Sequence, residues 1–467
     1  YRNMSENVQK TLRDSAALRW LALILLAGAM FCSYIFMDIL SPIKDLMWDT
    51  KGWDSTAFGT MQGSETFLNV FVFFLIFAGI ILDKMGVRFT AILSGAVMLV
   101  GASINWYALT DMFAGSNLEV WFNEHLNYIP GFDELGVSPF YKGMPASAKF
   151  SAIGFMIFGC GVEMAGITVS RGIVKWFKGR EMALAMGSEM ALARLGVATC
   201  MIFSPMFARL GGEVSVSRSV AFGVVLLMVA LIMFIVYAFM DKKLDSQTGE
   251  AEEKDDPFKL SDLGKILTDS GFWLVALLCV LYYSAIFPFQ KYAVNMLQCN
   301  LVFHQVDPTS IWASNTITII QYVIMLVVAA CAFASNFSKN KVAKYGLMGA
   351  AIVALVVFCY MGYMRQSAET VFAVFPLLAV GITPILGNYV DHKGKAATML
   401  VLGSLLLIAC HLTFAFVLPA FKGSEVGGII VAYITILVLG ASFSLVPASL
   451  WPSVPKLVDE KIIGSAY

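Results

Sequence analysis

The chain has 467 residues, 58% of them hydrophobic and 14% charged, and a mean hydropathy of +0.76. A soluble domain carries about 25% charged residues, so the composition excludes an ordinary soluble domain and indicates a protein whose solvent is lipid. The formal net charge of +0 gives no argument for nucleic-acid binding. Four His against 36 Phe argue against a metal or hydrolytic enzyme.

Twelve apolar stretches are each long enough to cross a bilayer, which takes about 20 residues. Hydrocarbon offers no hydrogen-bond partner, so each stretch is predicted to be an α-helix, and the chain to be an all-α polytopic membrane protein. In chain order they are 18–40, 58–82, 89–110, 150–173, 181–207, 219–240, 271–297, 313–336, 343–364, 370–390, 396–419 and 427–451. The first is long enough to span and is predicted to be a membrane helix, not a cleaved signal.

Basic residues predict the orientation of these helices. With a cytoplasmic N-terminus, the inner segments hold 22 of the 32 Lys and Arg, and the outer side holds nine. The charged stretch 241–270 then lies inside and divides the chain into an N-terminal six-helix lobe, 1–240, and a C-terminal lobe, 271–467. The eight Cys are scattered through mostly apolar runs, where Cys acts as a small hydrophobe, and we expect no metal or other cofactor.

A very short loop joins the second and third apolar stretches. Gly79 is expected to let two helices approach closely, and Asp83 to meet the positive end of a neighbouring helix dipole. Gly86 permits a tight turn, while Lys84 and Arg88 anchor the loop on the cytoplasmic side.

The same pattern recurs after the tenth stretch, at Gly387, Asp391, Gly394 and Lys395. The two loops resemble the signature loops of the major facilitator superfamily. The resemblance implies two helical lobes around a central cavity and alternating access by rocking of one lobe against the other.

Further segments resemble the lysosomal dipeptide transporter group of this superfamily. They are Trp176–Glu181, Ala193–Gly196, Tyr282–Phe289, Ser444–Pro452, and Tyr34 with Asp38. As cavity-lining aromatic residues we select Tyr34, Tyr282, Tyr283, Phe287 and Trp451, although packing is the alternative for each.

Two departures from the family pattern affect the second lobe. The second signature loop follows the tenth stretch instead of the eighth, so about 325–370 is interpreted as an extra transmembrane hairpin. The sequence ends where the family would begin helix eleven, so the last two helices are expected to be missing.

Ionisable groups within the membrane are functional candidates. Arg194 lies about 20 Å and Glu163 about 16 Å from the inner face, at 1.5 Å per residue. They are expected either to pair with each other or to bind the opposite ends of a zwitterion. Glu189 is interpreted as a partner of a loop cation or, alternatively, as a proton-coupling group.

Asp38, Glu65 and Lys291 lie toward the outer ends of their helices, and the hypothesis is that Asp38 and Lys291 form an outer gate. The alternative is that these charges lie among the lipid headgroups.

The favoured function is a monomeric secondary or facilitative transporter of a small peptide or amino-acid-like zwitterion. It is expected in a bacterial inner membrane, with the bilayer and a small solute as partners, and coupling to protons is left open. An organic-anion/proton symporter and a non-transporting receptor or scaffold are the alternatives. No phosphate-binding loop or catalytic motif is present in the sequence, so an ATP-driven pump or an enzyme is not expected.

Overall fold

The computed structural model describes residues 11–126, 140, 143–178, 181–248, 264, 267–393 and 395–450. For residues 182–183, 384, 387–393 and 448 it describes the backbone alone. Trp451, proposed above as a cavity-lining residue, and Gly394, of the second signature loop, therefore lie outside the described residues.

The described chain is helical, and ten of its helices are long and apolar enough to cross a membrane. This confirms the predicted class of a polytopic α-helical membrane protein. The long helices are α1 Ala16–Met37, α5 Phe74–Ala108, α7 Ala146–Trp176, α8 Met182–Ala208, α9 Val216–Thr248, α11 Ser270–Asn300, α12 Asn315–Phe337, α13 Lys341–Met364, α14 Ala368–Lys393, α15 Ala396–Leu412 and α17 Gly427–Leu450. The apolar part of α14, Ala368–Thr383, is shorter than the rest.

The second predicted stretch, 58–82, is not one helix. It is divided into α3 Ser55–Gly63, a 3-10 turn η3 Ser64–Thr66, and α4 Phe67–Phe71, and it ends within α5. The break falls at Phe73, whose φ of 55° lies in the left-handed region. Continuous hydropathy cannot reveal such a break, because both sides of it are equally apolar.

The chain packs as two compact units. Unit 1 comprises residues 1–36, 51–193 and 220–257, and unit 2 comprises 37–50, 194–219 and 258–467. The boundary thus falls inside α8, between Ala193 and Arg194. The six-helix lobes expected from the sequence, 1–240 and 271–467, remain a prediction.

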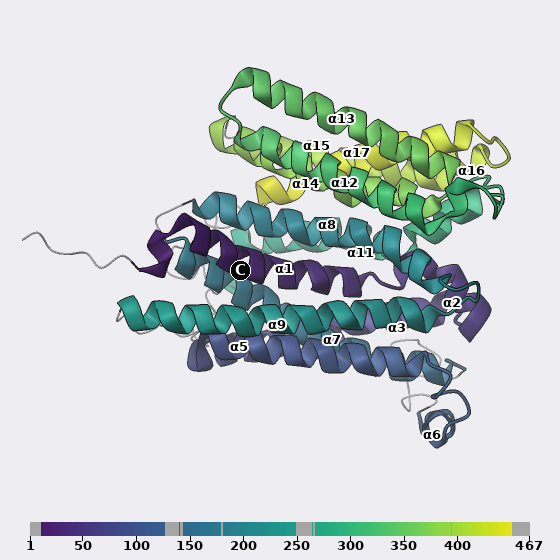
Figure 1. Ribbon diagram of the computed structural model, residues 1–467, viewed down its shortest axis with the longest axis horizontal. Helices are drawn as coiled ribbons and strands as arrows, with labels where there is room; N and C mark the ends of the chain where they lie inside the picture. Colours follow the sequence, from purple (N-terminus) through teal and green to yellow (C-terminus); the bar gives the residue numbers. More distant parts are fainter. Residues whose placement is uncertain are drawn as a thin grey trace, which may run out of the picture. The chain divides into compact units, whose positions relative to one another are not determined.

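Unit 1 is built around α5 and α7, which lie side by side (Figure 1). Their backbones approach so closely that a methyl group at Gly154 would lie 2.6 Å from the carbonyl oxygen of Gly101. A methyl group at Gly159 would overlap the carbonyl oxygen of Glu65, in η3. Small residues permit this contact because membrane helices associate largely through van der Waals packing.

The long outer loop carries the short helix α6, Asn117–His125. Phe113, Phe122 and Ala146 are buried together, with Tyr107 and Phe150 packed against them. This aromatic cluster fixes the described part of the loop to the outer ends of α5 and α7.

In unit 2, α12 packs on α13, and α17 packs on both α14 and α15 (Figure 1). A π-helical stretch, η5 Thr413–Val417, connects α15 to the short α16, Leu418–Ala420. Within the described part of the chain, six helical segments of membrane length follow the inner linker: α11, α12, α13, α14, α15 with α16, and α17.

The predicted extra hairpin at about 325–370 covers the second part of α12 and all of α13. α12 runs without a break to Phe337, and α13 and α14 follow it as separate helices. The interpretation of this segment as an addition to the family pattern stays a prediction, as does the expected absence of the last two helices.

The contact between α5 and α7 predicts a strong effect of one methyl group. Gly154→Ala should lower the melting temperature of the detergent-solubilised protein, because overpacking costs about 1–3 kcal/mol. Gly166→Ala, on the same helix, is the control, since nothing lies within 4 Å of its added methyl. Equal melting temperatures for the two variants would contradict the close approach.

Candidate functional site

A buried ion pair lies where α1 ends. α1 stops at Met37, and the Asp38 carboxylate that follows is 1% exposed. Lys291, on α11, places its Nζ 2.7 Å from Asp38 Oδ1 and also donates to the carbonyl oxygen of Met37 at 2.8 Å. Gln290 Nε2 donates to Asp38 Oδ2 at 2.7 Å. The structure thus brings together two residues selected from the sequence, and adds Gln290, which the sequence did not indicate.

The segment around this pair is packed against α8. Ser204 Oγ donates to the carbonyl oxygen of Ile39 at 2.5 Å. Cys200, one turn earlier on α8, is buried within electrostatic range of both Asp38 and Lys291. Because Cys200 and Ser204 lie on the same face of α8, this face packs against the segment that holds the ion pair.

Arg194 lies on α8 ten residues before Ser204. Its guanidinium carbon is 4.5 Å from the ring centroid of Phe443 on α17, which is cation–π distance. It is also within electrostatic range of Tyr282. Among the described residues of unit 2, no carboxylate lies within ion-pair distance of Arg194.

Glu163 lies on α7 in unit 1 and is half-buried. The described part of that unit offers its carboxylate no hydrogen bond and no ion pair. Glu189, on the part of α8 that belongs to unit 1, is also half-buried.

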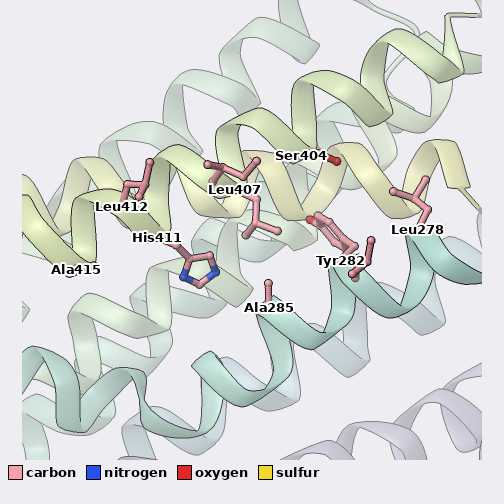
Figure 2. A pocket seen from close by; sticks show the side chains of 10 residues that line it. Leu278, Tyr282, Ala285, Ser404, Leu407, His411, Leu412 and Ala415 are labelled. Atoms are coloured by element: carbon pink, nitrogen blue, oxygen red, sulfur yellow. The ribbon is translucent and has the colours of Figure 1, made fainter.

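A cavity of about 580 Å³ lies between α11 and α15 in unit 2 (Figure 2). Its walls are Leu278, Leu281, Tyr282, Ala285, Ser404, Leu407, Ile408, His411, Leu412 and Ala415. The Tyr282 hydroxyl donates to the carbonyl oxygen of Ser442 at 3.0 Å, which fixes its ring at the wall. His411 points from α15 toward α11, and its Nε2 is buried without a hydrogen-bond partner.

His411 was not selected from the sequence as a binding residue. Its imidazole and Ser404 provide polar groups in an otherwise apolar cavity. A single His in an apolar stretch of sequence does not indicate that its side chain lines a cavity. Only the pairing of α11 with α15 places it opposite Ala285 and near Tyr282.

The other selected aromatic residues differ in environment. The Tyr283 and Phe287 rings stack at 5.2 Å on the side of α11 where Phe287 is 44% exposed. Tyr34 is half-buried in unit 1. Glu65 is buried in η3 against α7, also in unit 1, and therefore does not belong to the unit that holds the Asp38–Lys291 pair.

The first signature loop forms a charged cluster in unit 1. Gly86 is the only non-helical residue inside α5, with φ 81° and ψ 170°, a conformation that favours glycine. Asp83 Oδ1 binds Arg171 of α7 at 2.8 Å, so its partner is a side chain and not the helix dipole we expected. Lys84 is exposed, and nothing lies within 4 Å of a methyl at Gly79, so close packing there is not seen.

Asp241, on α9, is the centre of a network that the sequence did not indicate. It accepts hydrogen bonds from Lys175 Nζ at 2.7 Å and Trp176 Nε1 at 2.9 Å, and Arg88 lies 3.6 Å away. Arg88 and Lys175 also pair with Asp245. The loop therefore connects α5, α7 and α9 through charge.

The second signature loop joins α14 to α15. α14 ends at Lys393, and α15 begins after Lys395, which is exposed. The side chains of Gly387 and Asp391 lie outside the described residues, so their expected roles stay predictions.

With this geometry in place, the comparisons with known proteins identify the class. A family model described as Major Facilitator Superfamily matches residues 26–368. This range is more than half of the chain, and the chain belongs to the major facilitator superfamily.

Curated relatives are similar over much of the chain. The lysosomal dipeptide transporter MFSD1 of Bos taurus is 24% identical over 323 residues, 68% of this chain and 53% of the bovine protein. The Homo sapiens protein of that name is 22% identical over 460 residues, 97% of this chain and 76% of the human one. The match thus spans about half the length of the bovine relative.

Solved structures agree on the fold. The nucleoside transporter NupG aligns with a TM-score of 0.56 and 12% identity, covering 96% of this chain and 85% of NupG. The peptide transporter POT in complex with alafosfalin aligns with a TM-score of 0.50 and 13% identity, covering 95% and 83%. The chain therefore has the major facilitator fold.

The Asp241 network predicts a test of the inner cluster. Asp241→Asn should lower the melting temperature markedly, because removing one partner of a buried ion pair costs about 3–5 kcal/mol. Asp111→Asn is the matched control, since Asp111 is fully exposed and its contact with Lys51, at 4.0 Å, is too long to contribute much to stability. A melting temperature unchanged in Asp241→Asn would show that the network does not stabilise unit 1.

Proposed function

We propose that this major facilitator chain carries a small zwitterion, a short peptide or an amino-acid-like solute, across the bilayer by alternating access. The observation that carries the proposal is Arg194. It is a guanidinium on a membrane helix with an aromatic face beside it and no carboxylate within ion-pair distance among the described residues of its unit.

A cation at this depth is costly unless it has a function. A solute carboxylate is a suitable partner, since a planar guanidinium binds carboxylates through two parallel hydrogen bonds. The neighbouring Tyr282 and the cavity between α11 and α15 provide apolar walls for a side chain. Pockets of about 300–1,000 Å³ with few polar groups are typical of small-molecule sites.

From the sequence we propose that Glu163 binds the ammonium end of such a solute. Its carboxylate is half-buried on a membrane helix and has no partner in the described residues of unit 1. Direct pairing of Glu163 with Arg194 remains the alternative. The name of the mammalian relatives, lysosomal dipeptide transporter, supports the interpretation of the solute as a zwitterion over a simple organic anion.

Uptake into proteoliposomes tests this function. Arg194→Gln should reduce dipeptide uptake by about a hundredfold, and Arg194→Lys by less, because Lys keeps the charge but loses the two-point hydrogen bond. Glu163→Gln should weaken uptake of zwitterions more than uptake of monocarboxylates. Lys422→Gln, on the outer surface of the second half, should transport normally.

The same assay separates the alternatives. Monocarboxylate uptake equal to dipeptide uptake would favour the organic-anion carrier. Dependence on an inward proton gradient, lost in Glu163→Gln or Glu189→Gln, would favour proton symport over uniport. Thermal stabilisation by a solute without any uptake would favour a receptor and overturn the transport proposal.

We further propose that Asp38 and Lys291 form an outer gate that opens by separating the two charges. In the closed arrangement both are shielded from water, and Cys200 lies buried beside them. Separation would hydrate both charges and uncover this face of α8.

Thiol labelling tests the gate. In a Cys299→Ser background, which removes an exposed thiol, Asp38→Asn should speed alkylation of Cys200 by an impermeant reagent about tenfold, because the pair that keeps it buried is lost. Exchanging the charges, with Asp38→Lys and Lys291→Asp together, should restore slow labelling and transport. Normal uptake and slow labelling in both Asp38→Asn and Lys291→Met would exclude the gate.

The two signature loops are proposed to control the opposite, inner end. Asp83, Gly86 and Arg88 join α5 to α7 and α9, so the inner end of unit 1 can move as one body. The second loop, with Gly387, Asp391, Gly394 and Lys395, is proposed to act in the same way between α14 and α15.

We place the protein in a bacterial inner membrane as a monomer with the N-terminus inside. The excess of Lys and Arg on the predicted inner segments supports this orientation. Reporter fusions that fluoresce only in the cytoplasm test it, and an outer N-terminus would reverse the inner and outer assignments used above.

A further inference from the structure

A second and larger cavity, of about 890 Å³, lies in unit 2 at the outer end of α8, α11 and α12. Met201, Ile202 and Pro205 of α8 form its apolar wall. The loop that follows α11 and the turn between α13 and α14 form its polar wall. None of its charged lining residues was selected from the sequence as a binding residue.

Arg365, in the turn between α13 and α14, is a largely buried cation that forms no ion pair among the described residues, although the Glu369 carboxylate lies within electrostatic range of it. Its Nη1 donates to Gln321 Oε1 at 2.6 Å and its Nη2 to Thr318 Oγ1 at 2.7 Å, and both acceptors are neutral. Its Nε is buried without a hydrogen-bond partner. In the part of the chain that the structure describes, no carboxylate lies within ion-pair distance of Arg365.

The cavity carries charges of both signs. Arg209 extends from the end of α8 as a second cation. Glu369 is 8% exposed and its Oε2 accepts a hydrogen bond from Ser367, while Asp307 comes from the loop after α11. Two hydrogen bonds from Thr309 hold the pKa of the Asp307 carboxyl below its ordinary value, so Asp307 is ionised at neutral pH.

The polar wall is fixed by hydrogen bonds. The backbone N–H of His304 donates to Gln366 Oε1 at 3.1 Å, and its imidazole Nε2 lies 3.1 Å from Glu425 Oε1. These contacts connect the loop after α11 to the turns before α14 and α17. The loop that carries Asp307 is therefore linked to the turn that carries Arg365.

The cavity lies next to the buried Asp38–Lys291 pair. Ser204 donates a hydrogen bond to Ile39, the residue after Asp38, and the next residue on α8, Pro205, lines the cavity. On α11, Gln298 lines it seven residues beyond Lys291, which is about 10 Å along the helix axis. A solute in this cavity would lie immediately outside the Asp38–Lys291 pair.

We propose that this cavity is a second, outer binding site for a small solute that carries a carboxylate and an ammonium group. Arg365 and Arg209 bind the carboxylate, and Glu369 and Asp307 bind the ammonium. The choice of a zwitterion rests on the proposed function, but the site itself rests on the buried Arg365, which forms no ion pair among the described residues, and on the charges of both signs around it.

Protection of an introduced thiol tests the site in the full-length protein. Gln305→Cys places a thiol on the cavity wall, in a Cys299→Ser background. Alanyl-alanine should slow its reaction with an impermeant thiol reagent at least threefold. Alanyl-alanine amide and N-acetyl-alanyl-alanine, each lacking one charge, should protect it less. A thiol at Lys422→Cys, outside the cavity, should show no protection.

Variants distinguish this site from the central one. Arg209→Gln and Glu369→Gln should each raise the dipeptide concentration for half-protection about tenfold, as expected for loss of a charge-assisted hydrogen bond. Protection should persist in Arg194→Gln, which disables the proposed central site. Protection lost in Arg194→Gln would show that it reports the central site and would overturn the proposal.

The outcomes for the outer site and for transport are separable. Dipeptide uptake by the parent protein without protection of Gln305→Cys would overturn the outer site and leave the proposed function intact. Protection without uptake would support the outer site and contradict transport of that solute. A substitution of Arg365 could disturb the fold, because Arg365 also donates hydrogen bonds to Gln321 and Thr318. The test therefore relies on Arg209→Gln and Glu369→Gln.

Discussion

The constraint on which the rest of the structure depends is that hydrocarbon offers no hydrogen bonds. It forces the backbone into long helices, and it makes every departure from a helix require local compensation. The break at Phe73 separates two helical segments that each satisfy their own backbone groups. The break at Gly86 lies beside the Asp83–Arg171 and Arg88–Asp245 pairs, where charged side chains fix the turn. Irregular backbone thus occurs where neighbouring groups hold it.

The same constraint sorts the charged side chains into two kinds. Asp38 and Asp241 are buried but fully compensated, the first by Lys291 and Gln290, the second by Lys175 and Trp176. Arg194 and Arg365 are different, because no carboxylate lies within ion-pair distance of either one among the described residues of their unit, and the acid within electrostatic range of Arg365 is Glu369. A buried charge that has an ion-pair partner stabilises the fold or one conformational state of the protein. A buried cation without an ion-pair partner is available to bind the anionic group of a ligand.

Much of the fold could be predicted from the sequence, because hydropathy and the excess of basic residues report directly on the bilayer. The two signature loops identified the superfamily, and the family match at 26–368 agrees. The stretches 313–336, 343–364 and 370–390 correspond closely to α12, α13 and α14. The subdivision of 58–82 could not be predicted, because hydropathy measures how apolar a stretch is and a left-handed Phe73 does not change that measure.

The site was predictable only where a residue is unusual for its environment. Asp38, Lys291 and Arg194 were found because charge is rare within membranes. Gln290 and His411 were missed, because a polar residue in an apolar run shows its role only after α11 is paired with its neighbours. Arg365 was not selected, since its burial depends on α12 and α13 packing together. Long-range contacts, not local composition, decide these cases.

The two kinds of charge together explain how a solute could drive the carrier. A ligand shifts a conformational equilibrium only by the difference between its affinities for the two states. In the proposed mechanism, the Asp38–Lys291 pair stabilises the arrangement that is closed at the outer end, and the solute brings the carboxylate that binds Arg194. If a bound carboxylate interacts with Arg194 more strongly in one state, each 1.4 kcal/mol of that difference shifts the populations about tenfold.

An ion pair that also has a neutral donor, such as Gln290 beside Asp38, can open at moderate cost, because both charges become hydrated when the pair separates. A covalent or purely apolar seal would offer no such compensation, so a buried but hydratable pair is a physically suitable gate for a carrier whose solute supplies the opposing charge.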